Sequence, residues 1–371
     1  MNAINRIILV GNGFDLAHGL ATRYADFINW YWEKYLNHLR MCHNRTYSDH
    51  LCTFILNDNH NTWSALLWSI LNPIKLPSGQ EFYEHIKSDE KNFTIHYSAF
   101  MKRICQSIEL KGWVDIENEY YTALNEEYFE TPEKINEEFE IVKSNLIEYL
   151  SYIQKKDITT SIIEHKLQEK ILSPIMISEV AISARRQLID FIQARSTLDE
   201  QHLINESALS IHDVLNPDED DSRTSEFIRE CINQMEKNGT ASTSIIENAI
   251  DNDIVPDSML YPNRLMLSNF NYTNTADLYI PQSRNYKDKF IINHIHGTLK
   301  DYASIIFGYG DELDDRYTEL VKLNNNDFLH NIKSIKYLET DNYRKMLAFI
   351  DSALTKSILW GTLVVIRTEL Y

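Results

Sequence analysis

The first strongly apolar stretch of the chain is the run Ile7-Ile8-Leu9-Val10, which leads directly into Gly11-Asn12-Gly13. A short unbroken apolar run that ends in glycine is typical of a buried strand that turns into a helix. In open α/β sheets this turn lies at the carboxyl end of the strand, where backbone N–H groups can meet a phosphate. Glycines also close such turns for purely steric reasons, so the ligand needs further support.

Three later apolar runs predict further strands. Each ends in a polar or glycine-containing turn, and the runs are Arg264–Ser268, Phe290–His296 and Ala303–Phe307. The carboxyl ends of parallel strands lie along one edge of a sheet, where ligands bind. We therefore expect an α/β protein with a pocket along this edge. A late helix, Tyr343–Leu354, leads to a final apolar run at residues 358–360.

The middle of the chain shows the hydrophobic period of helices. Aromatic residues recur at helical spacing from Tyr24 to Tyr35, which predicts a helix to about Arg40 with this stripe packed on the core. Helical patterns also dominate from residue 133 to 195 and from 227 to 237, and no strand pattern competes from 133 to 195.

Glycine and proline are scarce, with 10 and 8 residues, which favours long helices over many short strands. We interpret residues 31–255 as a large helical insertion. The nucleotide-binding α/β core then consists of residues 1–30 and 256–371, within one domain that spans 1–371.

Composition narrows the function classes. The 371 residues include 36 basic and 54 acidic ones, for a net charge of −18. Nucleic-acid binding depends on neutralising phosphates, so this balance argues against DNA or RNA as the main partner. No apolar run approaches the ~18 residues of a membrane span, and no signal peptide precedes the first strand. We expect a cytoplasmic protein without a membrane partner. The four scattered cysteines predict free thiols and no metal site.

Two turn residues carry the candidate chemistry. The amide of Asn271 can orient a ribose hydroxyl or a water, and a neutral His296 can accept a proton near pH 7. With Gly11 and Gly13 beside a pyrophosphate, this set suits cleavage of the glycosidic bond of a nucleotide. The alternative stays open, because turn asparagines often bond their own backbone and strand-end histidines are often only structural.

A carboxylate pair, Asp115 and Glu117, opens another predicted helix that follows Gly112. Two such side chains could do acid–base work. Residues two apart on a helix do not share a face, so we interpret them as solvated or capping groups near the positive end of the helix.

The chain resembles members of the bacteriophage abortive-infection AbiH family from residue 7 to about residue 360, least so in the helical middle. The matching motifs are LVGNGFDLAHGL with Tyr24 and Asp26-Phe27, Trp113-x-Asp115-x-Glu117, Asn269–Thr273, His294-x-His296-Gly297, Ile306–Gly310, and Lys333-Ser334 with Tyr337. Singly these motifs are unspecific, and together they are specific.

The AbiH family in turn is similar to sirtuin-like defence proteins, which hydrolyse NAD to starve a phage-infected cell. The resemblance implies a sirtuin-like, Rossmann-type parallel sheet with Asn271 and His296 as catalytic residues. It implies a nucleotide contact by the following residues: Gly11, Asn12, Gly13, Phe14, Asp15, Tyr272 and Gly308. The pattern departs at two positions, since Asp15 replaces a serine and Thr273 replaces an aspartate. A carboxylate at position 15 would oppose phosphates unless it contacts ribose.

The last residues depart further from the family, which continues after the final strand with a Gly-His-Ser segment that ends in Asp-Arg. The chain instead reads WGTLVVIRTELY. Permitted codons for this tail, read one base out of frame, give GHSCGNSDRTL. We therefore expect a frameshift that truncates the product, a hypothesis that the gene sequence would test.

These expectations converge on an abortive-infection protein that binds NAD or a related nucleotide as ligand or substrate and requires no further cofactor. NAD glycohydrolysis is the candidate reaction. A non-catalytic nucleotide sensor or partner-binding module, and an inactive truncated product, are the alternatives. A phage-derived trigger and a homo-oligomer both fit the resemblance.

Overall fold

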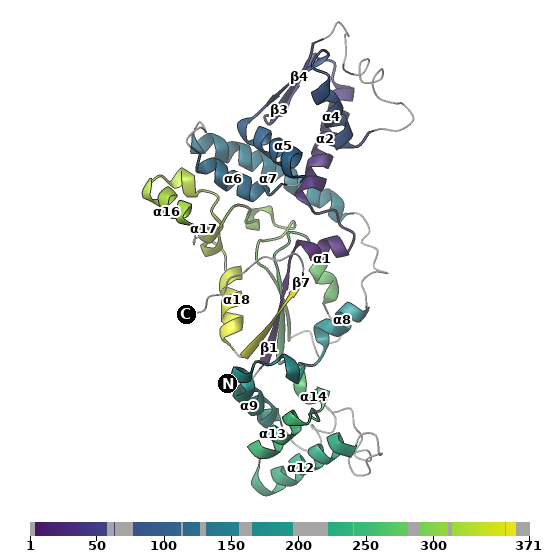
Figure 1. Ribbon diagram of the computed structural model, residues 1–371, viewed down its shortest axis with the longest axis vertical. Helices are drawn as coiled ribbons and strands as arrows, with labels where there is room; N and C mark the ends of the chain where they lie inside the picture. Colours follow the sequence, from purple (N-terminus) through teal and green to yellow (C-terminus); the bar gives the residue numbers. More distant parts are fainter. Residues whose placement is uncertain are drawn as a thin grey trace.

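The computed structural model shows an elongated molecule with a parallel sheet between two groups of helices (Figure 1). The structure describes residues 4–57, 63, 77–112, 114–126, 131–155, 165–195, 222–239, 241–280, 289–310, 314–352 and 354–360. None of the helices in these ranges has the length and apolar character needed to cross a membrane. The tail 361–371, on which the truncation hypothesis rests, lies outside the described residues.

Four parallel strands form the central sheet in the order β6-β5-β1-β7. They are β1 (Ile4–Val10), β5 (Arg264–Asn269), β6 (Phe290–His294) and β7 (Leu354–Trp360). In the pairing register, Val10 lies opposite Asn269, and Asn269 lies opposite His294. The turns after β1, β5 and β6 therefore share one edge, which confirms the predicted parallel sheet.

Alternate residues of β1 pack against opposite faces of this sheet, as the period of a strand requires. On one face Ile8 and Val10 contact a cluster that includes α1 (Asn12–Ala17) and α8 (His165–Leu172). On the other face Ile7 packs with Met346 and Phe349 of α18 (Asn342–Asp351). Because both faces are covered, the strand reads as an unbroken apolar run.

The predicted strand at residues 303–307 is wrong. The segment begins as part of a 3₁₀ turn, η5 (Tyr302–Ser304), and continues without regular structure. Its apolar residues are nonetheless buried, because Ile305 and Phe307 belong to an apolar core that also contains Phe27. Burial in an irregular segment and burial in a strand leave the same apolar run in a sequence. The fourth place in the sheet is taken by β7.

The segment 31–255, which we interpret as a helical insertion, is not purely helical. It contains a second, antiparallel sheet of three strands, β2 (Thr46–Ser48), β3 (Cys52–Leu56) and β4 (Phe93–Tyr97). Cys52, Phe54 and Leu56 are buried and alternate with more exposed residues, which is the period of a strand with one covered face. This alternation is too short to stand out beside the long helices.

The upper helices carry the predicted aromatic stripe. They are α2 (Tyr24–Met41), α4 (Gly79–Ser88), α5 (Ala99–Lys111), α6 (Ile116–Leu124) and α7 (Pro132–Gln154). In α2 the buried residues Phe27, Tyr31 and Tyr35 face a common core, which confirms the predicted helix and the packing role of its aromatic side. This group of helices stands over the carboxyl edge of the central sheet (Figure 1).

A lower group of helices lies at the opposite end of the sheet (Figure 1). It consists of α9 (Arg185–Arg195), α12 (Ser222–Asn238), α13 (Thr243–Asp251) and α14 (Asp257–Leu260), after the short turns η2 (Ile177–Glu179) and η3 (Ile182–Ala184). These helices share a separate apolar core that Ile4 of β1 joins. The remaining elements, near the carboxyl edge, are η4 (Thr275–Tyr279), α16 (Asp315–Lys322), η6 (Asn326–Leu329) and α17 (Lys333–Leu338).

Arg6 fastens the end of α8 to the central strand. Its guanidinium is 1% exposed and donates through Nη1 to the carbonyl oxygens of Ile171 and Ser173, at 2.8 and 2.6 Å. Nη2 donates to the carbonyl of Pro174 at 3.1 Å. These carbonyls lie at and beyond the carboxyl end of α8, where a cation is favourable. Burial lowers the pKa of this guanidinium.

We expect Arg6→Met to lower the free energy of unfolding by about 2 to 4 kcal/mol, because it leaves buried carbonyls without donors. Denaturant unfolding measures this loss. Arg186→Met is the matched control, since Arg186 is 72% exposed and its ion pair with Asp190 should contribute less than about 1 kcal/mol. Equal losses in the two variants would contradict the role of Arg6.

Candidate functional site

The glycine turn and Asn271 meet at the carboxyl edge of the sheet. Gly11 has an extended backbone and precedes α1, and its carbonyl accepts a hydrogen bond from Nδ2 of Asn271 at 3.0 Å. Asn271 is 8% exposed, and its Oδ1 accepts no hydrogen bond from any described residue. The side chain is therefore held at its nitrogen, and its oxygen remains an acceptor.

A turn asparagine often makes hydrogen bonds to the backbone of its own turn, and here Asn269 makes them. Asn269 accepts a hydrogen bond from the backbone N–H of Asn271 at 3.0 Å and donates to the carbonyl of Thr273 at 3.0 Å. Asn269 is fully buried. It fixes the turn from within, which leaves Asn271 to reach across to β1.

The remaining residues of the glycine turn divide into exposed and buried ones. Asn12 is exposed, and its Oδ1 accepts a hydrogen bond from the hydroxyl of Thr22. Gly13 is half-buried. Phe14 is 5% exposed and packs its ring against Tyr279. A nucleotide contact by the side chain of Phe14 stays a prediction that this packing does not favour.

Asp15 and Thr273, the two departures from the sirtuin-like pattern, contact each other. The Thr273 hydroxyl donates to Oδ2 of Asp15 at 2.6 Å, and the residues are 1% and 2% exposed. Oδ1 of Asp15 has no partner among the described residues. Burial raises the pKa of this carboxyl, against the opposing hydrogen bonds of Thr273 and Thr275. The pair joins α1 to the turn after β5 inside the protein.

His296 makes its contacts with a different set of residues. Its Nε2 lies 2.8 Å from the hydroxyl of Tyr337, and the two rings are stacked. The backbone carbonyl of Phe270 takes the other ring N–H. This network assigns the tautomer with the proton on Nδ1 and makes Nε2 the acceptor for Tyr337. Burial and the charge of Lys333 hold the pKa of His296 well below its ordinary value, so the ring is neutral at pH 7.

Gly308 is fixed by a carboxylate from the helices above the sheet. Its backbone N–H donates to Oε1 of Glu117 at 3.0 Å, and its φ is +154°. A Cβ at this position would lie 1.8 Å from the carbonyl oxygen of Asn331. Close packing thus explains the glycine, and its N–H already has an acceptor. A nucleotide contact by Gly308 remains a prediction.

Glu117, which we expected from the sequence to be a solvated or capping group, instead contacts residues near His296. It forms an ion pair with Lys333, with Nζ–Oε1 at 2.9 Å and the two side chains only 18% and 15% exposed. Its neighbour Asp115 does cap α6, accepting a hydrogen bond from the N–H of Asn118 at 3.1 Å, as expected. The motif Trp113-x-Asp115-x-Glu117 contains both carboxylates. Their spacing on a helix does not reveal that Glu117 reaches residues of another element.

Helix α17 links this ion pair to the histidine. Lys333 and Tyr337 are four residues apart on α17 and therefore share a face. Lys333 contacts Glu117, and Tyr337 contacts His296. Tyr272 completes the group, since its ring lies 6.0 Å from that of His296 and its hydroxyl donates to the carbonyl of Ile306 at 3.1 Å. Burial and the charge of Glu117 raise the pKa of Tyr272 well above its ordinary value.

The predicted site residues thus form two groups around one turn. Asn271 belongs with Gly11, Asp15 and Thr273, and the group of His296 includes Tyr272, Glu117, Lys333 and Tyr337. In the described part of the chain, no hydrogen bond joins Asn271 to His296. The turn Asn269–Thr273 brings both groups to the same edge of the sheet.

A further set of hydrogen bonds, centred on His294, also holds this turn. His294 lies between Asn269 and Asp277, with ring nitrogen distances of 3.2 Å to Nδ2 of Asn269 and 3.1 Å to Oδ1 of Asp277. Lys300 adds an ion pair to Asp277 at 3.5 Å. Because Nδ2 of Asn269 can only donate, Nε2 of His294 carries the proton and donates to Asp277.

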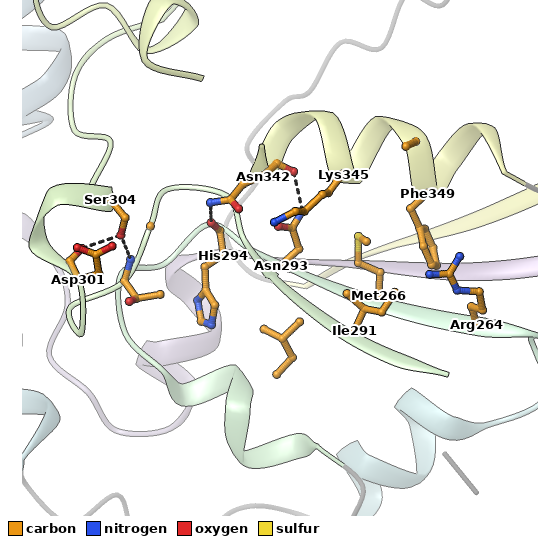
Figure 2. A pocket seen from close by; sticks show the side chains of 14 residues that line it. Arg264, Met266, Ile291, Asn293, His294, Asp301, Ser304, Asn342, Lys345 and Phe349 are labelled. Atoms are coloured by element: carbon orange, nitrogen blue, oxygen red, sulfur yellow. Dashed lines mark hydrogen bonds between the residues drawn. The ribbon is translucent and has the colours of Figure 1, made fainter. Parts of the chain in front are cut away.

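A cavity of about 620 Å³ lies next to these groups and not within them. It runs along β6 beneath α18, and Figure 2 shows its polar and apolar walls. Its lining includes His294 and Gly297, which flank His296 in the chain. Gly11, Asn271 and His296 do not line it, so the predicted chemistry and this hollow are separate features. The four cysteines are free thiols, and the described residues contain no cluster of three or more metal-ligating side chains.

Comparison with known proteins identifies one relationship. A model of the family described as Bacteriophage abortive infection AbiH matches residues 7–180. No curated protein matches the chain, and no solved structure does. The matched segment contains both the glycine turn before α1 and Glu117 of α6. Residues 7–180 are therefore similar to the bacteriophage abortive infection AbiH family.

Proposed function

We propose that this protein acts in abortive infection through a nucleotide pocket at the carboxyl edge of a sirtuin-like sheet, with NAD as the candidate substrate. The match of residues 7–180 to the AbiH family model supports the defence role. The observation that carries the pocket is the side chain of Asn271. Its Nδ2 is held by the carbonyl of Gly11 and its Oδ1 has no described donor, which leaves an oriented acceptor beside the glycine turn.

In this proposal Gly11 and Gly13 admit the pyrophosphate, and Oδ1 of Asn271 accepts a hydrogen bond from a ribose hydroxyl or the attacking water. The C1′–N bond of the nicotinamide riboside breaks with its electron pair going to nicotinamide, and a C1′–O bond to water forms. The water then loses a proton.

His296 is the final acceptor of that proton. Because Nε2 of His296 already accepts the hydrogen bond of Tyr337, the proton passes in two linked transfers. The phenolic proton of Tyr337 moves to Nε2 while the phenolic oxygen takes the proton of the water. A neutral histidine is required for this step, and burial beside Lys333 keeps it neutral.

Asn271→Ala and His296→Ala should each lower NAD cleavage by the purified protein on the order of 100-fold, because Asn271 contacts the reacting atoms and His296 is the final proton acceptor behind Tyr337. Loss of NAD and release of nicotinamide measure this. Asn248→Ala and His85→Ala are matched controls at exposed positions away from the edge of the sheet. If cleavage is present and survives both site variants, the assigned roles fail.

The second candidate is a nucleotide sensor without turnover. It is favoured by one observation, the hydrogen bond from Tyr337 that occupies the acceptor nitrogen of His296. A sensor would show a rise in melting temperature with NAD or ADP-ribose that Asn271→Ala abolishes, without nicotinamide release. If no nucleotide shifts the melting temperature, the pocket itself is absent.

A further inference from the structure

The cavity along β6 has features of a ligand site of its own. It lies between the face of β6 and α18, with Met266, Ile291 and Phe349 forming an apolar wall (Figure 2). Its volume of about 620 Å³ falls within the range of about 300 to 1,000 Å³ that is typical of small-molecule sites. Apolar walls with a few convergent polar groups are the usual composition of such sites.

Two cations line this cavity without a described acidic partner, Lys345 beside Asn293 and Arg264 at one end (Figure 2). Arg264 and Lys345 both line it, and neither forms an ion pair with a described residue. The guanidinium of Arg264 lies over the ring of Phe349, 5.4 Å from its centre. In a chain of net charge −18, unpaired cations beside a hollow are notable, because acidic side chains outnumber basic ones by 54 to 36.

A buried amide supplies a further contact. Asn293 is 4% exposed and lines the cavity, and its Nδ2 donates to the backbone carbonyl of Asn342 at 2.8 Å. The Nδ2 of Asn342 donates to the carbonyl of His294 at 2.8 Å. Both amide nitrogens are thus used inside the protein, and neither Oδ1 accepts a hydrogen bond from a described residue. The cavity offers hydrogen-bond acceptors in its middle, with Lys345 beside them and Arg264 at one end (Figure 2).

The only acidic side chain among the lining residues is Asp301, at the far end from Arg264 (Figure 2). An anionic group therefore belongs in the half of the cavity that Lys345 and Arg264 line, away from Asp301. Hydroxyl donors belong beside the amide oxygens of Asn293 and Asn342, and an apolar ring belongs against Phe349 or Met266. A phosphorylated ribose carries the first two features, and a nucleoside monophosphate carries all three.

We propose that this cavity is a second ligand site, which binds a phosphorylated ribose and prefers one that carries a base. It is distinct from the proposed pocket at Gly11 and Asn271, since the two share no residue. The site fits an effector or a released product at least as well as a substrate, because no group with a catalytic role lines it.

Titration calorimetry with AMP and ribose 5-phosphate tests the site. AMP should bind, and ribose 5-phosphate should bind more weakly because it lacks the apolar contact. The double variant Arg264→Gln, Lys345→Gln should raise the Kd of AMP about tenfold, the change that corresponds to ~1.4 kcal/mol. The matched control is Arg344→Gln on the same helix, which removes one charge outside the cavity lining and should leave the Kd unchanged.

Asn271→Ala separates this site from the proposed function. AMP binding that persists in Asn271→Ala but weakens in the double variant supports a second site, whether or not NAD is cleaved. Binding that Asn271→Ala abolishes would assign AMP to the first pocket and overturn the inference. No detectable AMP binding, or equal weakening by Arg344→Gln, would also overturn it. Asn293→Asp, which places a negative charge among the acceptors, should weaken AMP binding as an independent check.

Discussion

Thr273→Val is expected to lower the free energy of unfolding at pH 7 by about 2 to 3 kcal/mol, although it changes neither volume nor shape appreciably. The hydroxyl of Thr273 is the donor to Oδ2 of Asp15, at 2.6 Å, and Oδ1 already lacks a described partner. Without this donor, a carboxyl that is 2% exposed loses its main hydrogen bond. Denaturant unfolding measures the effect, with the exposed Thr46→Val as control.

The loss of unfolding free energy caused by Thr273→Val should depend on pH in a defined direction. Burial raises the pKa of Asp15 in the folded protein above the value of 3.8 expected for the unfolded chain. Between these two values the folded state holds more protons, so stability falls as pH rises through this window. Thr273→Val removes a hydrogen bond that favours the carboxylate and extends the fall to higher pH. The difference between variant and parent should therefore shrink from about pH 8 towards about pH 4.

Exchanging the two residues should restore most of the stability. Asp15→Ser combined with Thr273→Asp again pairs a hydroxyl with a carboxyl, now as in the sirtuin-like pattern, with serine in the glycine turn and aspartate in the turn after β5. We expect the double variant to be more stable than the sum of the single losses by at least about 1 kcal/mol. Additive losses would contradict the interpretation of Asp15 and Thr273 as one exchanged pair.

Gly308→Ala is expected to have a larger effect, on the order of 3 to 5 kcal/mol, because strain and overpacking act together. The added Cβ would lie 1.8 Å from the carbonyl oxygen of Asn331, and φ is +154°. The displaced segment also carries the backbone N–H of Gly308, which donates a hydrogen bond to Glu117. The contact between the upper helices and the sheet edge should therefore loosen, which thermal unfolding and limited proteolysis would detect.

Gly239→Ala separates the two causes of this effect. Gly239 also has a positive φ, +73°, but an added Cβ there meets no atom within 4 Å. Gly239→Ala should lower the free energy of unfolding by only about 1 to 2 kcal/mol, because only the backbone conformation becomes unfavourable. If Gly308→Ala costs no more than Gly239→Ala, close packing against Asn331 is not the reason for the glycine.

Local sequence patterns were sufficient to predict those elements whose buried residues follow the regular period of a strand or a helix. The apolar runs of β1, β5 and β6 and the aromatic stripe of α2 predicted those elements correctly, since their burial follows directly from the period of a strand or a helix. The same reasoning failed at residues 303–307, where the apolar side chains fill a core without forming a strand. A run of apolar residues records burial and not the hydrogen bonds that define a strand.

The sequence by itself determined the parallel sheet, the glycine turn and the resemblance to the AbiH family, because each rests on residues close together in the chain or on motifs in a fixed order. Only the tertiary structure decided which side chains meet. It paired Asp15 with Thr273 and Glu117 with Lys333, across 258 and 216 residues. It also brought Asn271 into contact with Gly11 and His296 into contact with Tyr337. Contacts of this kind depend on how distant segments pack, and a chain carries no local pattern for them.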